Sequence, residues 1–157
     1  AASVPLAGLT ALQALRKGGV TKGSKVFIPA GSGGVGSLAI QIAKKLLGAS
    51  YVCTTASPGK GTEICKTAGA DRIVNYREEK FDEVLKDEGF DMAFDTTDEA
   101  GRMGGILKEG GKIVSIAGTP TPEAIKSIDG TPPNMILRFF LWMGRNKAAI
   151  KIAASGK

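Results

Sequence analysis

The chain has 157 residues, 43% of them hydrophobic and 22 of them glycine, which is typical of a single soluble α/β domain. The net charge of +6 comes from scattered basic residues, and this favours attraction of an anionic ligand over nucleic-acid binding. The absence of histidine excludes a Ser-His-Asp or Cys-His catalytic centre within the chain, and two cysteines are too few for a metal site. No apolar run reaches the roughly 18 residues of a membrane span, and no signal peptide is recognisable, so we expect a cytoplasmic protein without membrane contact.

Predicted helices and strands alternate along the chain. Leucines at every third position from residue 6 to residue 15 predict a first helix, which two glycines then end. Strands are predicted at 26–29, 51–55, 72–76, 90–95 and 112–118, and helices between them at 37–47, 59–68, 81–86 and 100–107. A last helix is predicted from Pro132 through the apolar segment 135–143, and no sixth strand follows it. This alternation predicts a Rossmann-type α/β fold, a doubly wound parallel sheet of five strands in the order 3-2-1-4-5 within three α/β/α layers.

A glycine-rich stretch follows the first predicted strand. Gly31, Gly33 and Gly36 have the spacing G-x-G-x-x-G, and the residues among them are Ser32, Gly34 and Val35. In a dinucleotide-binding turn the first glycine permits the turn, the second lets the backbone approach a pyrophosphate, and the third lets helix and strand pack closely. The helix that follows directs free N–H groups and the positive end of its dipole at the phosphates. The stretch therefore predicts a dinucleotide site near the start of the chain.

The end of the second predicted strand indicates which nicotinamide cofactor binds. NAD-preferring domains place Asp or Glu there, about 20 residues after the glycines, to accept hydrogen bonds from the ribose 2′-hydroxyl. This chain has no carboxylate between Thr54 and Glu63, and it offers Ser57 and Lys60 instead. Both side chains suit a 2′-phosphate, so the sequence favours NADPH over NADH. In the alternative interpretation, Lys60 is an ordinary exposed lysine at a helix start.

Four segments together resemble the cofactor domain of the medium-chain dehydrogenases/reductases, in their zinc-independent quinone oxidoreductase-like branch. They are residues 5–12, 29–41, 69–79 and 108–118, and they occur in the family's order and spacing. The resemblance implies that residues 1–157 are an NADPH-binding Rossmann domain whose GroES-like catalytic domain lies outside the chain. It also implies hydride transfer from NADPH to a small-molecule quinone or enone in the complete protein. No catalytic residue and no metal ligand is then expected in this chain, which would have little turnover by itself.

The resemblance implies a role for individual residues as well. Gly33, Gly34 and Val35 would present backbone N–H groups to the pyrophosphate. The other implied contacts are Thr10 near the nicotinamide phosphate, Tyr76 near the 2′-phosphate, Asp95 and Thr96 near the ribose and nicotinamide, and Ala117 and Gly118 beside the nicotinamide.

Other interpretations remain open at this stage. An equally good interpretation makes Tyr76 an ordinary aromatic residue at a strand end. Asp95 is alternatively a cap of the next helix. The whole protein is alternatively a non-catalytic NADPH sensor, or a zinc alcohol dehydrogenase with metal ligands elsewhere. A homodimer is a further expectation, since sheet edges commonly form the dimer contact in the family that the chain resembles.

Overall fold

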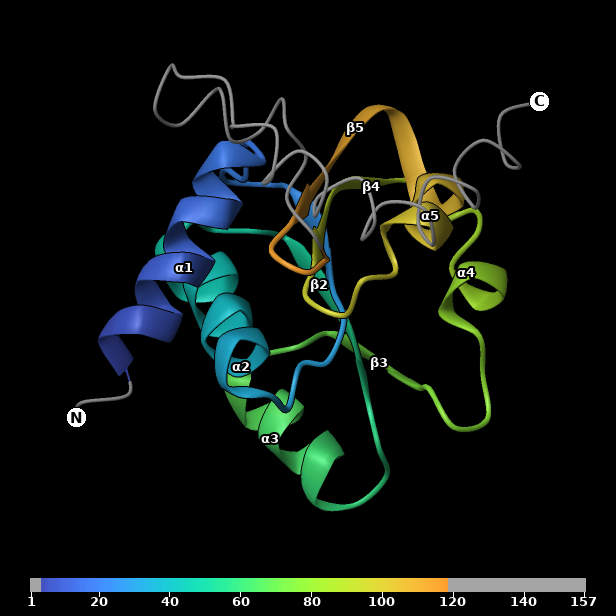
Figure 1. The fold of residues 1–157 in the computed structure, drawn as a ribbon, viewed down its shortest axis with the longest axis horizontal. Coiled ribbons are helices and arrows are strands. Elements are labelled where there is room, and N and C mark those ends of the chain that lie inside the picture. The colour runs from blue at the N-terminus through green and yellow to red at the C-terminus, as the bar shows by residue number, and fades with distance from the viewer. Residues whose placement is uncertain (1–3, 119–157) are drawn as a thin grey trace, which may run out of the picture. The chain divides into compact units, whose positions relative to one another are not determined.

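The computed structural model describes residues 4–118, and these form one five-stranded, all-parallel sheet (Figure 1). The strand order β3-β2-β1-β4-β5 confirms the prediction of a Rossmann-type fold. The predicted last helix and the expected lack of a sixth strand concern residues outside the described range. The strands are β1 (Lys25–Ile28), β2 (Tyr51–Ala56), β3 (Arg72–Asn75), β4 (Phe90–Asp95) and β5 (Leu107–Ser115). The helices are α1 (Val4–Lys17), α2 (Gly34–Gln41) with its π-helical extension η1 (Ile42–Leu46), α3 (Lys60–Ala68), α4 (Phe81–Val84), α5 (Ala100–Met103) and the 3₁₀ turn η2 (Gly104–Ile106).

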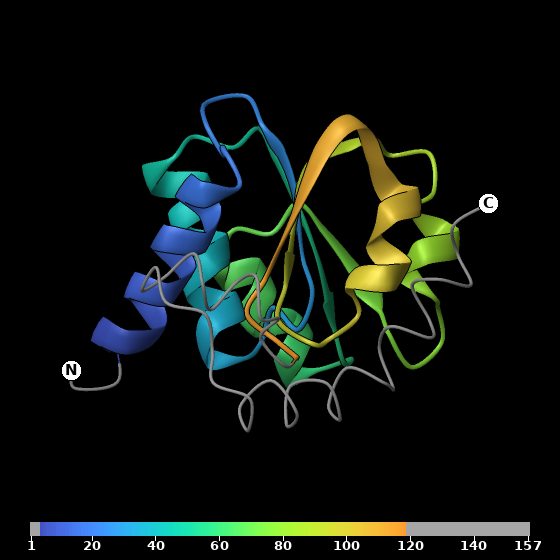
Figure 2. The ribbon, with the colours of Figure 1, turned by 45° about the horizontal axis from the view of Figure 1, so that its top comes forward.

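Helices cover both faces of the sheet. Helices α1, α2 and α3 lie on one face, and α4 and α5 lie on the other (Figure 2). Successive side chains of β1 alternate between the two hydrophobic clusters: Val26 and Ile28 pack with the first helix layer, and Phe27 packs with the second. All three side chains are fully buried, which explains why β1 reads as an uninterrupted apolar run.

Aromatic packing fixes the position of α4. The ring centroid of Phe27 lies 4.9 Å from that of Phe81 at the start of α4, and 5.8 Å from that of Phe90 in β4. Phe81 is only 4% exposed, so the short helix is anchored to the centre of the sheet by its first residue. Ring pairs at such distances stabilise by about 1 kcal/mol beyond the burial of their area.

Two elements start three or more residues before the predicted position, and β5 ends at Ser115 rather than at residue 118. Helix α2 begins at Gly34, inside the glycine stretch, rather than at residue 37. Strand β5 begins at Leu107 rather than at residue 112, because Leu107 pairs with Phe90 and the chain then bulges before Lys112 pairs with Met92. The bulge contains Gly110 at a φ of +73°, a conformation that favours glycine. Within residues 4–118, no helix combines the length and the hydropathy that a bilayer span requires.

Candidate functional site

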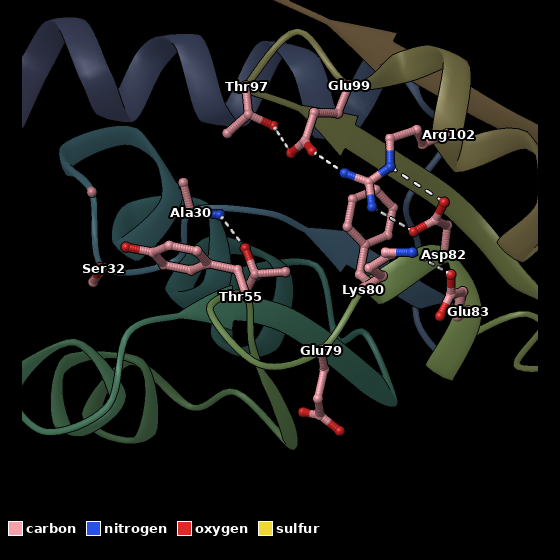
Figure 3. A pocket seen from close by; sticks show the side chains of 13 residues that line it. Ala30, Ser32, Thr55, Glu79, Lys80, Asp82, Glu83, Thr97, Glu99 and Arg102 are labelled. Carbon is pink, nitrogen blue, oxygen red and sulfur yellow. Dashed lines mark hydrogen bonds and ion pairs between the residues drawn. The ribbon is translucent and has the colours of Figure 1, made fainter.

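A cavity of about 840 Å³ opens at the carboxyl ends of the strands. Its walls come from the turn between β1 and α2, the end of β2, the segment from β3 into α4, and the loop from β4 to α5 (Figure 3). The order of the sheet reverses between β1 and β4, which is where open α/β sheets bind ligands. The lining residues are Ala30, Ser32, Gly33, Thr55, Tyr76, Glu79, Lys80, Phe81, Asp82, Glu83, Thr97, Glu99 and Arg102.

Hydrogen bonds to Thr55 hold the turn between β1 and α2. The Ala30 N–H donates to the Thr55 hydroxyl at 3.0 Å, and the Gly31 N–H donates to the Thr55 carbonyl at 3.0 Å. Ala30 has a φ of +51° and supplies a left-handed residue of the turn, whereas the glycine spacing attributes the turn to Gly31 and gives no role to Ala30. No sequence signal marks Ala30 for this conformation, which is uncommon outside glycine, asparagine and aspartate.

At two positions of the stretch, close packing leaves no room for any residue other than glycine. A Cβ atom at Gly31 would lie 2.1 Å from the Thr54 hydroxyl, and one at Gly36 would lie 2.3 Å from the Ala30 carbonyl oxygen. The expected close packing at Gly36 is therefore present, and Gly31 packs equally tightly. By contrast, a Cβ at Gly33 would meet only the Ala30 carbonyl oxygen at 3.2 Å, and one at Gly34 would meet nothing within 4 Å. The backbone at Gly33 and Gly34 is thus open to a ligand.

The start of α2 is built to accept an anion. Gly33 is its N-cap residue, and among the described residues no side chain caps the helix there. The first intrahelical bond runs from the Ser37 N–H to the Gly33 carbonyl at 2.9 Å, so the amides of Gly34, Val35 and Gly36 precede the hydrogen-bonded turns. The first turn also carries no acidic residue. Free amides, the helix dipole and an open approach together fit a diphosphate.

The three residues predicted to meet a 2′-phosphate occupy different places. Tyr76, which is 56% exposed, lines the 840 Å³ cavity. Lys60 lines a second cavity of about 350 Å³ beside α2, together with Ser37 and Gln41. A Cβ at Gly61 would lie 2.9 Å from the Ser57 hydroxyl and 3.6 Å from the Ser32 hydroxyl, so both serines lie near the start of α3.

Asp95 is fully buried, and its carboxylate accepts hydrogen bonds from three groups of the protein itself. It accepts hydrogen bonds from the Thr97 N–H at 3.0 Å, the Glu99 N–H at 3.1 Å and the Ser115 hydroxyl at 2.8 Å. Asp95 therefore orders the loop before α5, whose N-cap residue is Glu99. The neighbouring Thr96 donates its hydroxyl to the Pro29 carbonyl at 3.1 Å and joins the ends of β4 and β1.

The residues expected near the nicotinamide do not line the cavity. The Thr10 hydroxyl donates to the Leu6 carbonyl of its own helix at 2.8 Å. The Ala117 N–H donates to the Ser115 hydroxyl at 3.1 Å, and Gly118 has a φ of +86°. Their predicted contacts with a cofactor stay predictions.

Sequence reasoning missed a cluster of charged side chains in the cavity wall. Arg102 binds Asp82 through two hydrogen bonds, Nε to Oδ2 at 3.2 Å and Nη2 to Oδ1 at 2.5 Å, and donates from Nη1 to Glu99 at 2.5 Å (Figure 3). The bond from Arg102 holds the pKa of Asp82 below its ordinary value. The spacing of Glu99 and Arg102 on one helical turn was the only available signal, because Asp82 lies 20 residues away in the sequence.

Known proteins with similar sequences are dehydrogenases and reductases. The model of the zinc-binding dehydrogenase family matches residues 34–146. The chain is 37% identical over 152 residues to the 2-methylene-furan-3-one reductase of Solanum lycopersicum, covering 96% of the chain and 38% of that protein. It is 38% identical over 128 residues to an NADPH-dependent alkenal/one oxidoreductase, chloroplastic, of Arabidopsis thaliana, covering 82% of the chain and 32% of that protein.

A solved structure extends this similarity to the fold. The quinone oxidoreductase from Coxiella burnetii aligns with a TM-score of 0.69 at 36% identity, covering 96% of this chain and 49% of that one. The chain thus spans less than half the length of each of these three proteins. Among residues 4–118, no three potential metal ligands of the types His, Cys, Asp and Glu gather at one place.

Proposed function

The chain belongs to the zinc-binding dehydrogenase family, among the quinone oxidoreductase-like medium-chain dehydrogenases/reductases, and on that premise we propose that it is the NADPH-binding domain of an enone or quinone reductase. One observation carries the proposal: the open backbone at Gly33 and Gly34 leads directly into the uncapped start of α2 at the switch point of the sheet. The names of the two plant relatives, a furanone reductase and an NADPH-dependent alkenal/one oxidoreductase, support the substrate class.

In this proposal the protein binds and orients the cofactor. The amides of Gly34 and Val35 bind the diphosphate, and the bond between Ala30 and Thr55 keeps the turn in the binding conformation. When bound, NADPH supplies the hydride that passes to the activated alkene or quinone. Since the chain spans 38% of the tomato reductase, we assign the opposite wall of the substrate cleft to the remainder of a longer protein.

The start of α3 supports a preference for the 2′-phosphate of NADPH. Gly59 is its N-cap residue at a φ of +76°, and no side-chain cap is present there within the described part of the chain. Ser57 and the exposed Lys60 flank this helix start. A phosphate at this point would interact with the Lys60 ammonium group, the Ser57 hydroxyl and the positive end of the α3 dipole. An unphosphorylated ribose gains none of the charge-assisted bonds.

Calorimetric titration of the chain with NADPH and with NADH tests the cofactor assignment. We expect NADPH to bind at least about tenfold more tightly, and Lys60→Glu to abolish the difference. Lys66→Glu is the matched control, because it makes the same charge change later on the same helix, where Lys66 is an exposed partner of Glu63. The control should keep the preference. Equal affinities for the two cofactors in the unaltered chain would contradict the assignment.

Turnover by the complete protein tests the reductase assignment separately. We expect oxidation of NADPH, followed at 340 nm, in the presence of small enones or quinones. Tight binding of NADPH without oxidation across both substrate classes would favour a sensor of the cofactor instead. Metal-dependent oxidation of alcohols would favour a zinc alcohol dehydrogenase.

A further inference from the structure

The 840 Å³ cavity has more carboxylates than cations in its wall. Glu79, Asp82, Glu83 and Glu99 line it, against Lys80 and Arg102. Lys80 pairs with Glu83 at 2.9 Å, but both side chains are about two-thirds exposed, so water screens that pair. A nucleotide carries phosphates, and carboxylates without partners beside it would repel it.

Arg102 pairs with two of these carboxylates and halves their net negative charge. Its guanidinium joins Asp82 in α4 to Glu99 in the loop before α5, so it reaches from one wall of the cavity to the other (Figure 3). The bond to Asp82 is bidentate, the strongest geometry for an arginine and a carboxylate. The Thr97 hydroxyl donates to the second oxygen of Glu99 at 2.8 Å and holds that carboxylate in place.

Packing fixes the guanidinium in this position. Its central carbon lies 4.6 Å from the ring centroid of Phe81, which is buried against Phe27. The Arg102 side chain is therefore held by two carboxylates and by an aromatic face, although 41% of it is exposed. A surface arginine without a role gains little from such fixation, because ordering a long side chain costs entropy.

We propose that Arg102 is a positioning residue that makes this cavity accept an anionic nucleotide, because its single positive charge offsets part of the charge of Asp82 and Glu99 and its hydrogen bonds hold both carboxylates away from the ligand. This inference rests on the proposed function, since it takes the nucleotide of NADPH as the ligand. Arg102 acts through the two carboxylates rather than by binding a phosphate itself. Its removal would leave two negative charges in the wall and weaken binding by electrostatic repulsion.

Titration of the chain with NADPH in low and high salt tests this role. In Arg102→Met we expect affinity to fall at least about tenfold at low salt, and the loss to shrink to about threefold at 0.5 M salt, because screening weakens the repulsion. In the triple variant Arg102→Met, Asp82→Asn, Glu99→Gln, affinity should return to within about threefold of the unaltered chain. A purely structural role for Arg102 would produce neither the salt dependence nor this recovery.

Arg72→Met is the matched control for lost stability. Arg72 pairs with Glu88, and the exposed fractions of the pair, 39% and 26%, resemble the 41% and 31% of Arg102 and Asp82. Arg72 does not line the cavity, so the affinity for NADPH should not change. If Arg102→Met does not fold, Arg102→Lys keeps the positive charge but loses the bidentate bond and the stacking on Phe81, so its loss of NADPH affinity at low salt should be smaller than about tenfold and should still shrink at 0.5 M salt.

The possible results separate the two proposals. Failure of the unaltered chain to bind NADPH would overturn the proposed function and this inference with it. Normal binding by the unaltered chain and by Arg102→Met would overturn the inference alone. So would a loss that is equal at both salt concentrations and persists in the triple variant.

Discussion

The amide of Ala30 donates a 3.0 Å hydrogen bond to the hydroxyl of Thr55, and this bond joins the turn after β1 to the end of β2. Thr55 is only 6% exposed, so the bond lies at the inner edge of the cavity. Ala30 holds a left-handed conformation, which costs an alanine roughly 1 kcal/mol or more. The bond to Thr55 offsets that cost and keeps the turn in the form that exposes Gly33 and Gly34.

The variant Thr55→Val should destabilise the chain by about 1 to 2 kcal/mol, because valine has the same shape but cannot accept the hydrogen bond from Ala30. The free energy of unfolding in urea measures the change. Thr67→Val is the control, since the exposed Thr67 hydroxyl donates to the Glu63 carbonyl within its own helix. A cost for Thr55→Val no greater than that of the control would contradict a structural role for the bond.

Two alanine substitutions in the glycine stretch should have opposite outcomes. Gly31→Ala should cost about 3 kcal/mol, because its Cβ would collide with Thr54, Ile40 and Cys65. Gly34→Ala should leave stability unchanged or raise it by up to about 1 kcal/mol, because the space there is open and alanine favours a helix. Urea unfolding measures both, and similar costs for the two variants would contradict the described packing of the turn.

Much of the fold could be predicted from local sequence pattern. The strands β1 and β4 contain short apolar segments, residues 26–28 and 92–94, which are buried on both faces of the sheet, and the glycine turn after β1 places the first crossover. The start of β5 could not be predicted, because the polar segment from Lys108 to Gly111 interrupts the strand pattern. Only the pairing of Leu107 with Phe90 on the neighbouring strand defines that start.

The site could be predicted only where one continuous segment builds it. The turn from Gly31 to Gly36 is such a segment, and the spacing of its glycines by itself indicates a dinucleotide-binding turn. The contact of Arg102 with Asp82 joins two segments that come together only in the folded sheet, so no local pattern indicates it. The same limit applies to Lys60 and Tyr76, which the sequence assigned to one phosphate and the structure places in separate cavities.

The variant Asp82→Asn should reduce the loss of stability in acid. The hydrogen bond from Arg102 keeps the pKa of Asp82 below its ordinary value of 3.8, so the folded chain binds this proton less readily than the unfolded chain does. The resulting stabilisation is present above pH 3.8 and is lost as the pH falls through the lowered pKa.

Urea midpoints measured from about pH 6 to pH 2 check this prediction, because the loss continues below pH 3.8. Asp91→Asn should independently reduce the loss of stability in acid, because the bond from Lys108 likewise lowers the pKa of Asp91. If the stability of Asp82→Asn falls in acid as steeply as that of the unaltered chain, the pairing of Asp82 with Arg102 is contradicted.

Neither thiol of the folded chain should react readily with a disulfide reagent at pH 8. Burial raises the pKa of the Cys53 thiol to about 12 and also raises the pKa of the Cys65 thiol, and both residues are fully buried. We expect labelling by Ellman's reagent to be at least roughly a hundredfold slower than in urea, where both thiols react. Rapid labelling of one thiol in the native chain would contradict its burial.

An ¹⁵N–¹H correlation spectrum of the chain, recorded during titration with NADPH, tests most directly whether the β1–α2 turn binds the cofactor. We expect the largest shifts of amide resonances at Gly33, Gly34 and Val35, and we expect Gly33→Ala to reduce both these shifts and the affinity. Large shifts confined to amides away from the β1–α2 turn, or a spectrum that NADPH leaves unchanged, would contradict this assignment.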